Sequence, residues 1–91
     1  MVLTVFYTSV TGSRETKKQQ ERLFSVLDSK GIAYQKKDIA AESELKDKMR
    51  FLANDPKALP PQISNGEQYC GDFNAFEEAV ECGTLEQFLK I

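Results

Sequence analysis

The chain has 91 residues, enough for one domain with a small hydrophobic core. Its 12 lysine and arginine residues and 14 aspartate and glutamate residues give a net charge of −2, which argues against nucleic acid or an anionic membrane as a partner. The sequence has no histidine and only two cysteines, which excludes serine-hydrolase and papain-like triads and a four-ligand structural zinc site within one chain.

Targeting segments and a disulfide scaffold are not expected. No apolar run approaches the ~20 residues of a membrane span, and the N-terminal residues lack the basic region and cleavage site of a signal peptide. Cys70 and Cys82 are too few for a disulfide framework. We therefore expect a single domain over residues 1–91 of a cytoplasmic protein whose thiols are reduced.

The first third of the chain is predicted to form a strand, a helix and a second strand. Val2–Tyr7 is a continuous apolar, β-branched and aromatic run, typical of a strand buried on both faces. After a polar loop, Ser13 can cap a helix over Arg14–Lys30, which Gly31 ends. Ile32–Ile39 has the pattern of a second, more polar strand. Two strands joined by a helix this short indicate a parallel pair with a right-handed crossover.

The first half of that helix is wholly polar. Its apolar stripe begins only at Leu23, after the polar run Arg14–Arg22. We therefore expect the front turns of the helix to project past the sheet into solvent, next to the loop Thr8–Gly12.

A second helix is predicted before the proline-rich stretch. Leu45, Met49 and Leu52 are spaced i, i+4 and i+7, which places them on one helical face against a sheet. Glu44 stands in the first turn, and Asn54-Asp55-Pro56 ends the helix.

Two adjacent prolines precede a predicted hairpin. Pro61 has no N–H and a fixed φ, so it can open a strand but cannot sit within a sheet. Gln62–Ser64 and Gln68–Cys70 flank Asn65-Gly66, a strong signal for a tight turn between antiparallel strands.

Two helices complete the expected fold. Asp72 is expected to cap a helix ended by Gly83, and Thr84 and Gln87 are expected to form a capping box for a last short helix. The order β-α-β-α-β-β-α-α predicts an α/β, thioredoxin-like or glutaredoxin-like domain with a four-stranded mixed sheet and helices on both faces. In that fold the proline opening the third strand is cis and faces the loop after the first strand, which we expect of Pro61.

Three segments carry a resemblance to a known family. Tyr7–Glu15, Lys57–Gly66 and Tyr69–Phe73 resemble the SH3-domain-binding glutamic-acid-rich-like protein family, a glutaredoxin-like branch of the thioredoxin-fold proteins. The similarity spans essentially the whole chain and is strongest to the short members without an acidic tail. It implies a cytosolic or nuclear protein that lacks the usual redox dithiol and modulates redox or signalling partners.

The position of the glutaredoxin sulfur tests that implication. Glutaredoxins place Cys-x-x-Cys, or one cysteine, at the start of the first helix, where the helix N-terminus stabilises the thiolate. The matching window here, Gly12–Glu15, contains no sulfur. Ser13 cannot carry thiol–disulfide exchange, and we expect it to be a helix cap. We therefore predict a non-catalytic binding or modulator module with no catalytic residue and no metal site.

The resemblance also implies a degenerate glutathione groove. In glutaredoxins, glutathione lies as an extended strand beside the residue before the cis proline and meets the helix after the fourth strand. That residue is Pro60 here, and it lacks the N–H usually offered to glutathione. No cofactor is therefore predicted, with weak glutathione binding as the alternative. The candidate groove residues are Thr8, Ser9, Val10, Thr11, Gly12, Ser13, Arg14, Lys57, Pro60, Pro61, Gln62, Gly71, Asp72 and Phe73.

Three charged residues of this set also have a structural interpretation. Asp72 is expected to serve as a helix cap, with ligand contact as the alternative. Arg14 and Lys57 are expected to be solvated surface charges, with contact to ligand carboxylates as the alternative.

We expect different roles for the two cysteines. Cys70 is expected to be a small buried hydrophobe. The alternative is a reactive thiol that is glutathionylated, or that bridges two chains around an iron–sulfur cluster with added thiols. Cys82 is expected to be structural.

The family name points to SH3 domains, and the proline segment Leu59, Pro60, Pro61, Gln62 and Ile63 is the candidate ligand. SH3 grooves take a PxxP pair in an exposed polyproline helix, and the three prolines of this chain include no such pair. We therefore expect a monomer that binds a protein partner, with iron–sulfur or redox handling and SH3 binding as alternatives.

Overall fold

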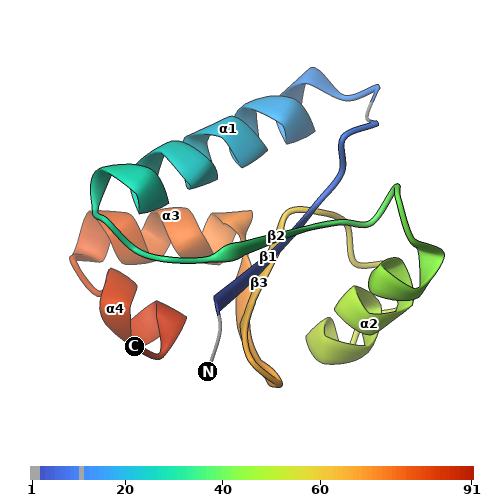
Figure 1. The fold of residues 1–91 in the computed structure, drawn as a ribbon. Helices are drawn as coiled ribbons and strands as arrows, with labels where there is room; N and C mark the ends of the chain where they lie inside the picture. The colour runs from blue at the N-terminus through green and yellow to red at the C-terminus, as the bar shows by residue number, and fades with distance from the viewer. Residues whose placement is uncertain (1–2, 11) are drawn as a thin grey trace.

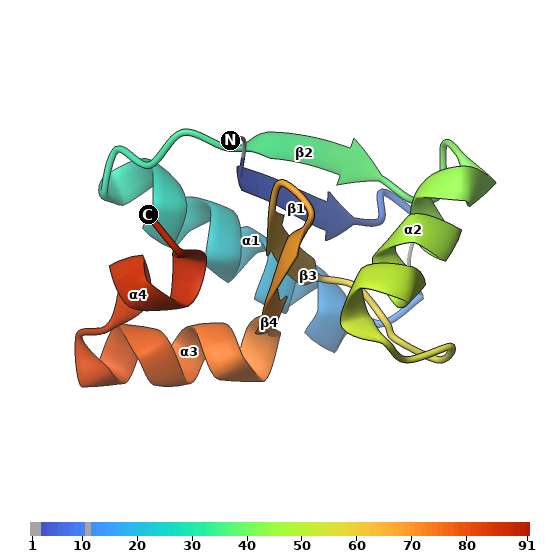
Figure 2. The same cartoon turned by 90° about the horizontal axis from the view of Figure 1, so that it is seen from below.

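The computed structural model describes residues 3–10 and 12–91. Its strands form a mixed four-stranded sheet in the order β2-β1-β3-β4 (Figures 1 and 2). β1 (Leu3–Tyr7) pairs parallel with β2 (Gln35–Asp38) and antiparallel with β3 (Gln62–Asn65). β4 (Gln68–Asp72) continues the sheet antiparallel to β3. The predicted thioredoxin-like order of elements is confirmed.

Helices cover both faces of the sheet, as Figures 1 and 2 show. α1 (Arg14–Ser29), α3 (Phe73–Cys82) and α4 (Leu85–Leu89) pack on one face. α2 (Ser43–Ala53) packs on the other. None of the helices in the described part of the chain is long and apolar enough to cross a membrane.

β1 supplies side chains to both halves of the core. Successive side chains of a strand point to opposite faces, so a strand covered on both sides is apolar throughout. Val5 is fully buried together with Leu23 of α1 and Phe76 of α3. Phe6, the next residue, is buried on the opposite face with Met49 of α2. The unbroken apolar run at the N-terminus therefore reflects the central place of β1 in the sheet.

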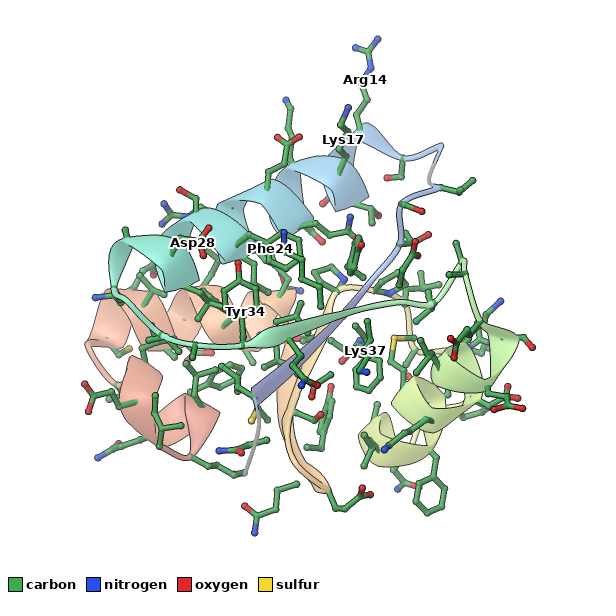
Figure 3. The ribbon with its side chains drawn as sticks, in the orientation of Figure 1. Arg14, Lys17, Phe24, Asp28, Tyr34 and Lys37 are labelled. Atoms are coloured by element: carbon green, nitrogen blue, oxygen red, sulfur yellow. The ribbon has the colours of Figure 1, made fainter. Side chains whose placement is uncertain are left out.

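Aromatic side chains join α1 to the end of β1 and to the residue before β2. The rings of Phe24 and Tyr34 are stacked with centroids 5.7 Å apart, and Tyr7 meets Phe24 edge-on at 5.6 Å. The hydroxyl of Tyr34 donates to Asp28 Oδ1 at 2.8 Å, and Figure 3 shows Phe24, Asp28 and Tyr34 together between the helix and the strand. Burial, followed by the contact with Asp28, raises the pKa of Tyr34 to about 12.

The second strand is shorter than the predicted Ile32–Ile39. The N–H of Ile32 donates to Leu27 O at 3.0 Å, which holds this residue in the C-terminal turn of α1. Gln35 is the first residue of this segment that pairs with β1, and it lies opposite Thr4. Ile32 and Tyr34 pack against the core without joining the sheet, and Ala33 between them is exposed.

The predicted capping box of the last helix is wrong. Thr84 is the N-cap of α4, but its side chain makes no capping hydrogen bond. Its backbone, with φ −113° and ψ 26°, lies outside the extended region from which an N-cap hydroxyl reaches the helix N–H groups. Gly83, in contrast, ends α3 at φ +69°, as predicted.

Candidate functional site

The start of β3, the start of α1 and the start of α3 enclose a groove. The peptide bond between Pro60 and Pro61 is cis, as predicted. Both prolines line the groove, which has a volume of about 460 Å³, together with Ser13 of α1 and with Phe73 of α3. The loop after β1 and the proline that opens β3 therefore meet at one corner, as the thioredoxin-like order requires.

The structure brings half of the predicted groove residues to this surface. Those that line the groove are Ser13, Lys57, Pro60, Pro61, Gln62, Asp72 and Phe73. Further lining residues, which sequence reasoning missed, include Glu15, Thr16, Gln19, Asp55 and Asn74. Most of these are polar residues of α1 and of the loop before β3, and their pattern in the sequence is that of an ordinary solvated surface.

The other predicted groove residues lie elsewhere. Thr8 and Gly12 line a neighbouring pocket of about 350 Å³, beside Lys46 and Arg50 of α2. Arg14 lines a hollow between α1 and α3, and Figure 3 shows its side chain, with that of Lys17, projecting from the start of α1. Of the remaining four, Ser9 and Val10 are exposed, Gly71 is buried, and Thr11 lies outside the described residues.

Two of the groove residues cap helices. Ser13 has extended backbone, and its Oγ accepts a hydrogen bond from Thr16 N at 3.2 Å. Asp72 does the same for α3, because its Oδ1 accepts from Ala75 N at 2.9 Å. Both cap predictions are confirmed, and each side chain satisfies a backbone donor that would otherwise be left at a helix end.

Gln62 ties the proline segment to the hairpin. Its Oε1 accepts a hydrogen bond from the hydroxyl of Tyr69, and its Nε2 donates to Leu59 O at 2.7 Å. Leu59 itself is 70% exposed, whereas Pro61 and Ile63 are buried. The carboxamide of Gln62 is therefore committed to holding the loop, and only the front of the segment faces solvent.

Gly71 has a packing role. Its φ is +154°, and a Cβ at this position would lie 2.7 Å from Phe88 Cε1 and 3.1 Å from Ala75 Cβ. A contact of 2.7 Å to a packed aromatic ring leaves no room for a side chain. The glycine therefore allows β4 to approach α4 closely.

Both cysteines are more exposed than the sequence predicts. Cys70 is half-buried and packs against the core on the α3 and α4 side. Burial raises the pKa of its thiol, and Lys90 only partly opposes that shift. Cys82 was expected to be structural, but it is exposed in the last turn of α3, where its side chain is not needed for packing. Neither cysteine lines the groove.

The loop after β1 is held by two side chains that the sequence did not single out. The carboxamide of Gln20 donates to Thr8 O at 3.0 Å and accepts from Thr8 N at 2.9 Å. Asp38 accepts from Ser9 Oγ at 2.6 Å and from Ser9 N at 3.2 Å, and it also accepts from Ala40 N at 2.9 Å. The hydrogen bond from the Ser9 hydroxyl is the largest cause of a lowered pKa at Asp38.

The residues at the groove do not fit an iron–sulfur cluster. A cluster needs thiolate ligands, and the position at the start of α1 is Ser13, whose hydroxyl caps the helix. In the described ranges, 3–10 and 12–91, no three cysteine, aspartate or glutamate side chains gather as metal ligands. Glutathione fits only in part, because Pro60 cannot offer a backbone N–H.

Comparisons with known proteins agree on family. The family model described as "SH3-binding, glutamic acid-rich protein" matches residues 1–91. A Drosophila melanogaster relative, the "SH3 domain-binding glutamic acid-rich protein homolog", is 41% identical over 103 aligned residues. The alignment covers 100% of this chain but only 65% of that relative, so the chain spans less than two-thirds of its length.

Solved structures agree on the fold. The Candida albicans actin interacting protein Aip5 matches with a TM-score of 0.80 and 23% identity, covering 97% of this chain and 87% of Aip5. A buckwheat glutaredoxin in complex with glutathione matches with a TM-score of 0.70 and 21% identity, covering 97% of this chain and 76% of the glutaredoxin. At these identities the likeness establishes a glutaredoxin-like fold.

Proposed function

The chain belongs to the SH3-binding, glutamic acid-rich protein family, and we propose that it is a glutaredoxin-like binding module without oxidoreductase activity. It holds a segment of a partner protein in the groove between the starts of α1 and α3. The partner segment lies extended along Pro60 and Pro61, which both line the groove.

Ser13 is the residue that carries this proposal. It stands on the groove wall with Pro61, at the helix start where glutaredoxins carry a cysteine. Thiol–disulfide exchange requires a sulfur that attacks and leaves, and a hydroxyl does neither at neutral pH. The chain also has no histidine to activate a serine as a nucleophile.

The character of the groove favours a protein partner. Phe73 forms part of the wall, and Leu59 stands 70% exposed at the rim. Large apolar side chains beside a concave surface are typical of sites that bind protein segments. Aip5, which shares the fold, is titled an actin interacting protein, so the scaffold occurs in a protein named for an interaction with another protein.

SH3 binding through the proline segment has no such support from the geometry. An SH3 domain reads an exposed polyproline helix. Here Pro61, Gln62 and Ile63 are buried, and the latter two are the first residues of β3. Leu59 and Pro60 are accessible, but the segment as a whole could form an exposed polyproline helix only if the third strand left the sheet.

Selection of short random-sequence peptides on the immobilised full chain tests the proposed function. Enriched peptides should shift the NMR signals of Ser13, Gln62 and Phe73. Phe73→Ala should weaken their binding about tenfold, and so should Asn74→Arg, which fills the groove from an exposed position. Phe51→Ala is the matched control, because Phe51 is an exposed aromatic on α2 outside the groove.

Two results would contradict binding in the groove. If selection enriches no peptide, or if both groove variants bind as well as the wild type while still folded, the groove is not the binding site. Circular dichroism and thermal unfolding of each variant establish that it is folded. Asn74→Arg is the more informative variant in this respect, because it removes no packed side chain.

A further inference from the structure

A second pocket lies beside the groove, between the loop after β1 and α2. It has a volume of about 350 Å³, and it is continuous with the groove because the two share Ser13, Thr16, Ala58, Leu59 and Pro60. Sequence reasoning placed Thr8 and Gly12 in the groove, but they line this pocket instead. The residues that line this pocket and not the groove are Thr8, Gly12, Ile39, Lys46 and Arg50.

The charge of this pocket is one-sided. Lys46 and Arg50 stand one helical turn apart on α2, and none of the described residues that line the pocket is acidic. This contrasts with a net charge of −2 for the whole chain. In the described part of the chain, neither cation forms an ion pair. Asp38, next to Ile39 in the sequence, is already bonded to the loop residue Ser9.

Arg50 is positioned by the protein and still able to bind. Its Nε donates to Ala58 O at 3.3 Å, which fixes the side chain against the loop before β3. A guanidinium has five N–H donors, so the terminal nitrogens are available for a ligand. Two cations that converge on a pocket, one of them partly fixed, match a carboxylate.

The remainder of the pocket has an apolar side and a hydroxyl-bearing side. Ile39, Ala58 and Pro60 are apolar, and so is Leu59, which is 70% exposed. The other lining residues are Thr8, Gly12, Ser13 and Thr16. Val10, in the loop that joins the lining residues Thr8 and Gly12, is 78% exposed. An apolar side next to a charged anchor suits an acidic side chain carried by a peptide with an apolar neighbour, and it suits a sugar-phosphate backbone poorly.

We propose that this pocket receives the side-chain carboxylate of an aspartate or glutamate in the partner segment, and that an apolar neighbour of that residue contacts Leu59. This inference rests on the proposed function, because it supplies the chemistry of the segment that continues out of the groove past Pro60. The partner is thereby an acidic-apolar segment of another protein.

The test again selects short random-sequence peptides on the immobilised full chain, and the peptides are displayed. Peptides displayed through their C-terminus have no free terminal carboxylate, so any acidic preference must come from side chains. Selection on the wild type at low ionic strength should enrich aspartate or glutamate next to a large apolar residue. Selection on Lys46→Glu should lose that enrichment.

Lys48→Glu is the matched control for that variant. Lys48 is on the same helix and its substitution changes the net charge equally, but it does not line the pocket and lies 3.4 Å from Glu67. For an individual enriched peptide, Lys46→Glu and Arg50→Gln should each raise Kd at least about fivefold. This rise in Kd should be smaller in high salt, because exposed charges are screened.

Three outcomes would overturn the inference. The first is selection without acidic enrichment on the wild type, and the second is unchanged enrichment on Lys46→Glu. The third is an equal loss of binding in Lys48→Glu, which would indicate a long-range charge effect without a specific pocket. Peptides that need the groove, shown by loss in Asn74→Arg, but ignore Lys46 would leave the proposed function intact and refute this inference alone.

Discussion

The carboxamide of Gln20 holds the backbone of Thr8 through two hydrogen bonds, one accepted from Thr8 N at 2.9 Å and one donated to Thr8 O at 3.0 Å. Gln20 is only 6% exposed, although it lies in the polar front half of α1. The clamp joins the end of β1 to the helix that carries Ser13. It therefore fixes the corner at which the groove and the neighbouring pocket meet.

Loss of this clamp should destabilise the fold. Gln20→Ala leaves the N–H and C=O of Thr8 without partners in a part-buried position, which should cost about 1–3 kcal/mol in the free energy of unfolding. Gln19→Ala is the control, because Gln19 has the same side chain on the same helix and makes only a 3.4 Å contact with Glu15. Urea unfolding compares the two, and equal midpoints would show that the clamp contributes nothing.

The clamp also shows the limit of prediction from the sequence. The polar run at the front of α1 correctly predicted a solvated helix end, but periodicity cannot distinguish one buried glutamine from its exposed neighbours. Gln20 is buried because its carboxamide matches both backbone groups of Thr8, and that match depends on the tertiary position of the loop. Lys46 and Arg50 were missed for a related reason, because lysine and arginine on a helix face ordinarily indicate solvent.

Acid should weaken the attachment of the loop to β2. The pKa of Asp38 in the folded protein is lowered from its ordinary value of 3.8, mainly by the hydrogen bond from the Ser9 hydroxyl. Because the folded state holds the charged form, this interaction stabilises the protein fully above pH values near 3.8 and is lost as pH falls through the folded-state pKa.

Ser9→Ala measures that contribution. The substitution removes the strongest hydrogen bond to Asp38, so NMR titration of the Asp38 carboxyl should give a higher pKa in the variant than in the wild type. The stability of the variant should also depend less on pH below about pH 4. An identical titration of Asp38 in both proteins would contradict the assigned cause.

Gly71 should tolerate no side chain. Gly71→Ala places a Cβ 2.7 Å from the ring of Phe88 at a φ of +154°, so overpacking should cost about 1–3 kcal/mol in the free energy of unfolding. Gly12→Ala is the control, because a Cβ at Gly12 would meet nothing within 4 Å. Thermal unfolding distinguishes them, and a neutral Gly71→Ala would show that β4 and α4 do not approach as described.

The two thiols should react at different rates. Cys82 is exposed, whereas Cys70 is half-buried with its pKa raised by burial, so less of Cys70 is thiolate near neutral pH. Iodoacetamide should therefore modify Cys82 well before Cys70 in the folded protein, as measured by mass spectrometry of the wild type and of Cys82→Ser. Faster modification of Cys70 would favour the reactive-thiol alternative.

The fold was more predictable than the site. The βαβ unit, the hairpin at Asn65-Gly66 and the caps at Ser13 and Asp72 follow from local rules, and the structure has each of them. The resemblance to glutaredoxins places Gly71 in the groove, at the start of the helix after the fourth strand, but its environment is set by Phe88, a residue seventeen positions away in α4. Packing between residues far apart in the chain cannot be predicted from local sequence patterns.

The claim that this scaffold no longer exchanges sulfur at its reactive corner is tested most directly by glutathione-dependent reduction of a small mixed disulfide. The wild type should show no activity above the uncatalysed background, because Ser13 stands where the attacking sulfur is needed and Cys70 lies outside the groove. Ser13→Cys is the positive control for a thiol placed at that helix start. Activity in the wild type that disappears in Cys70→Ser would contradict the account.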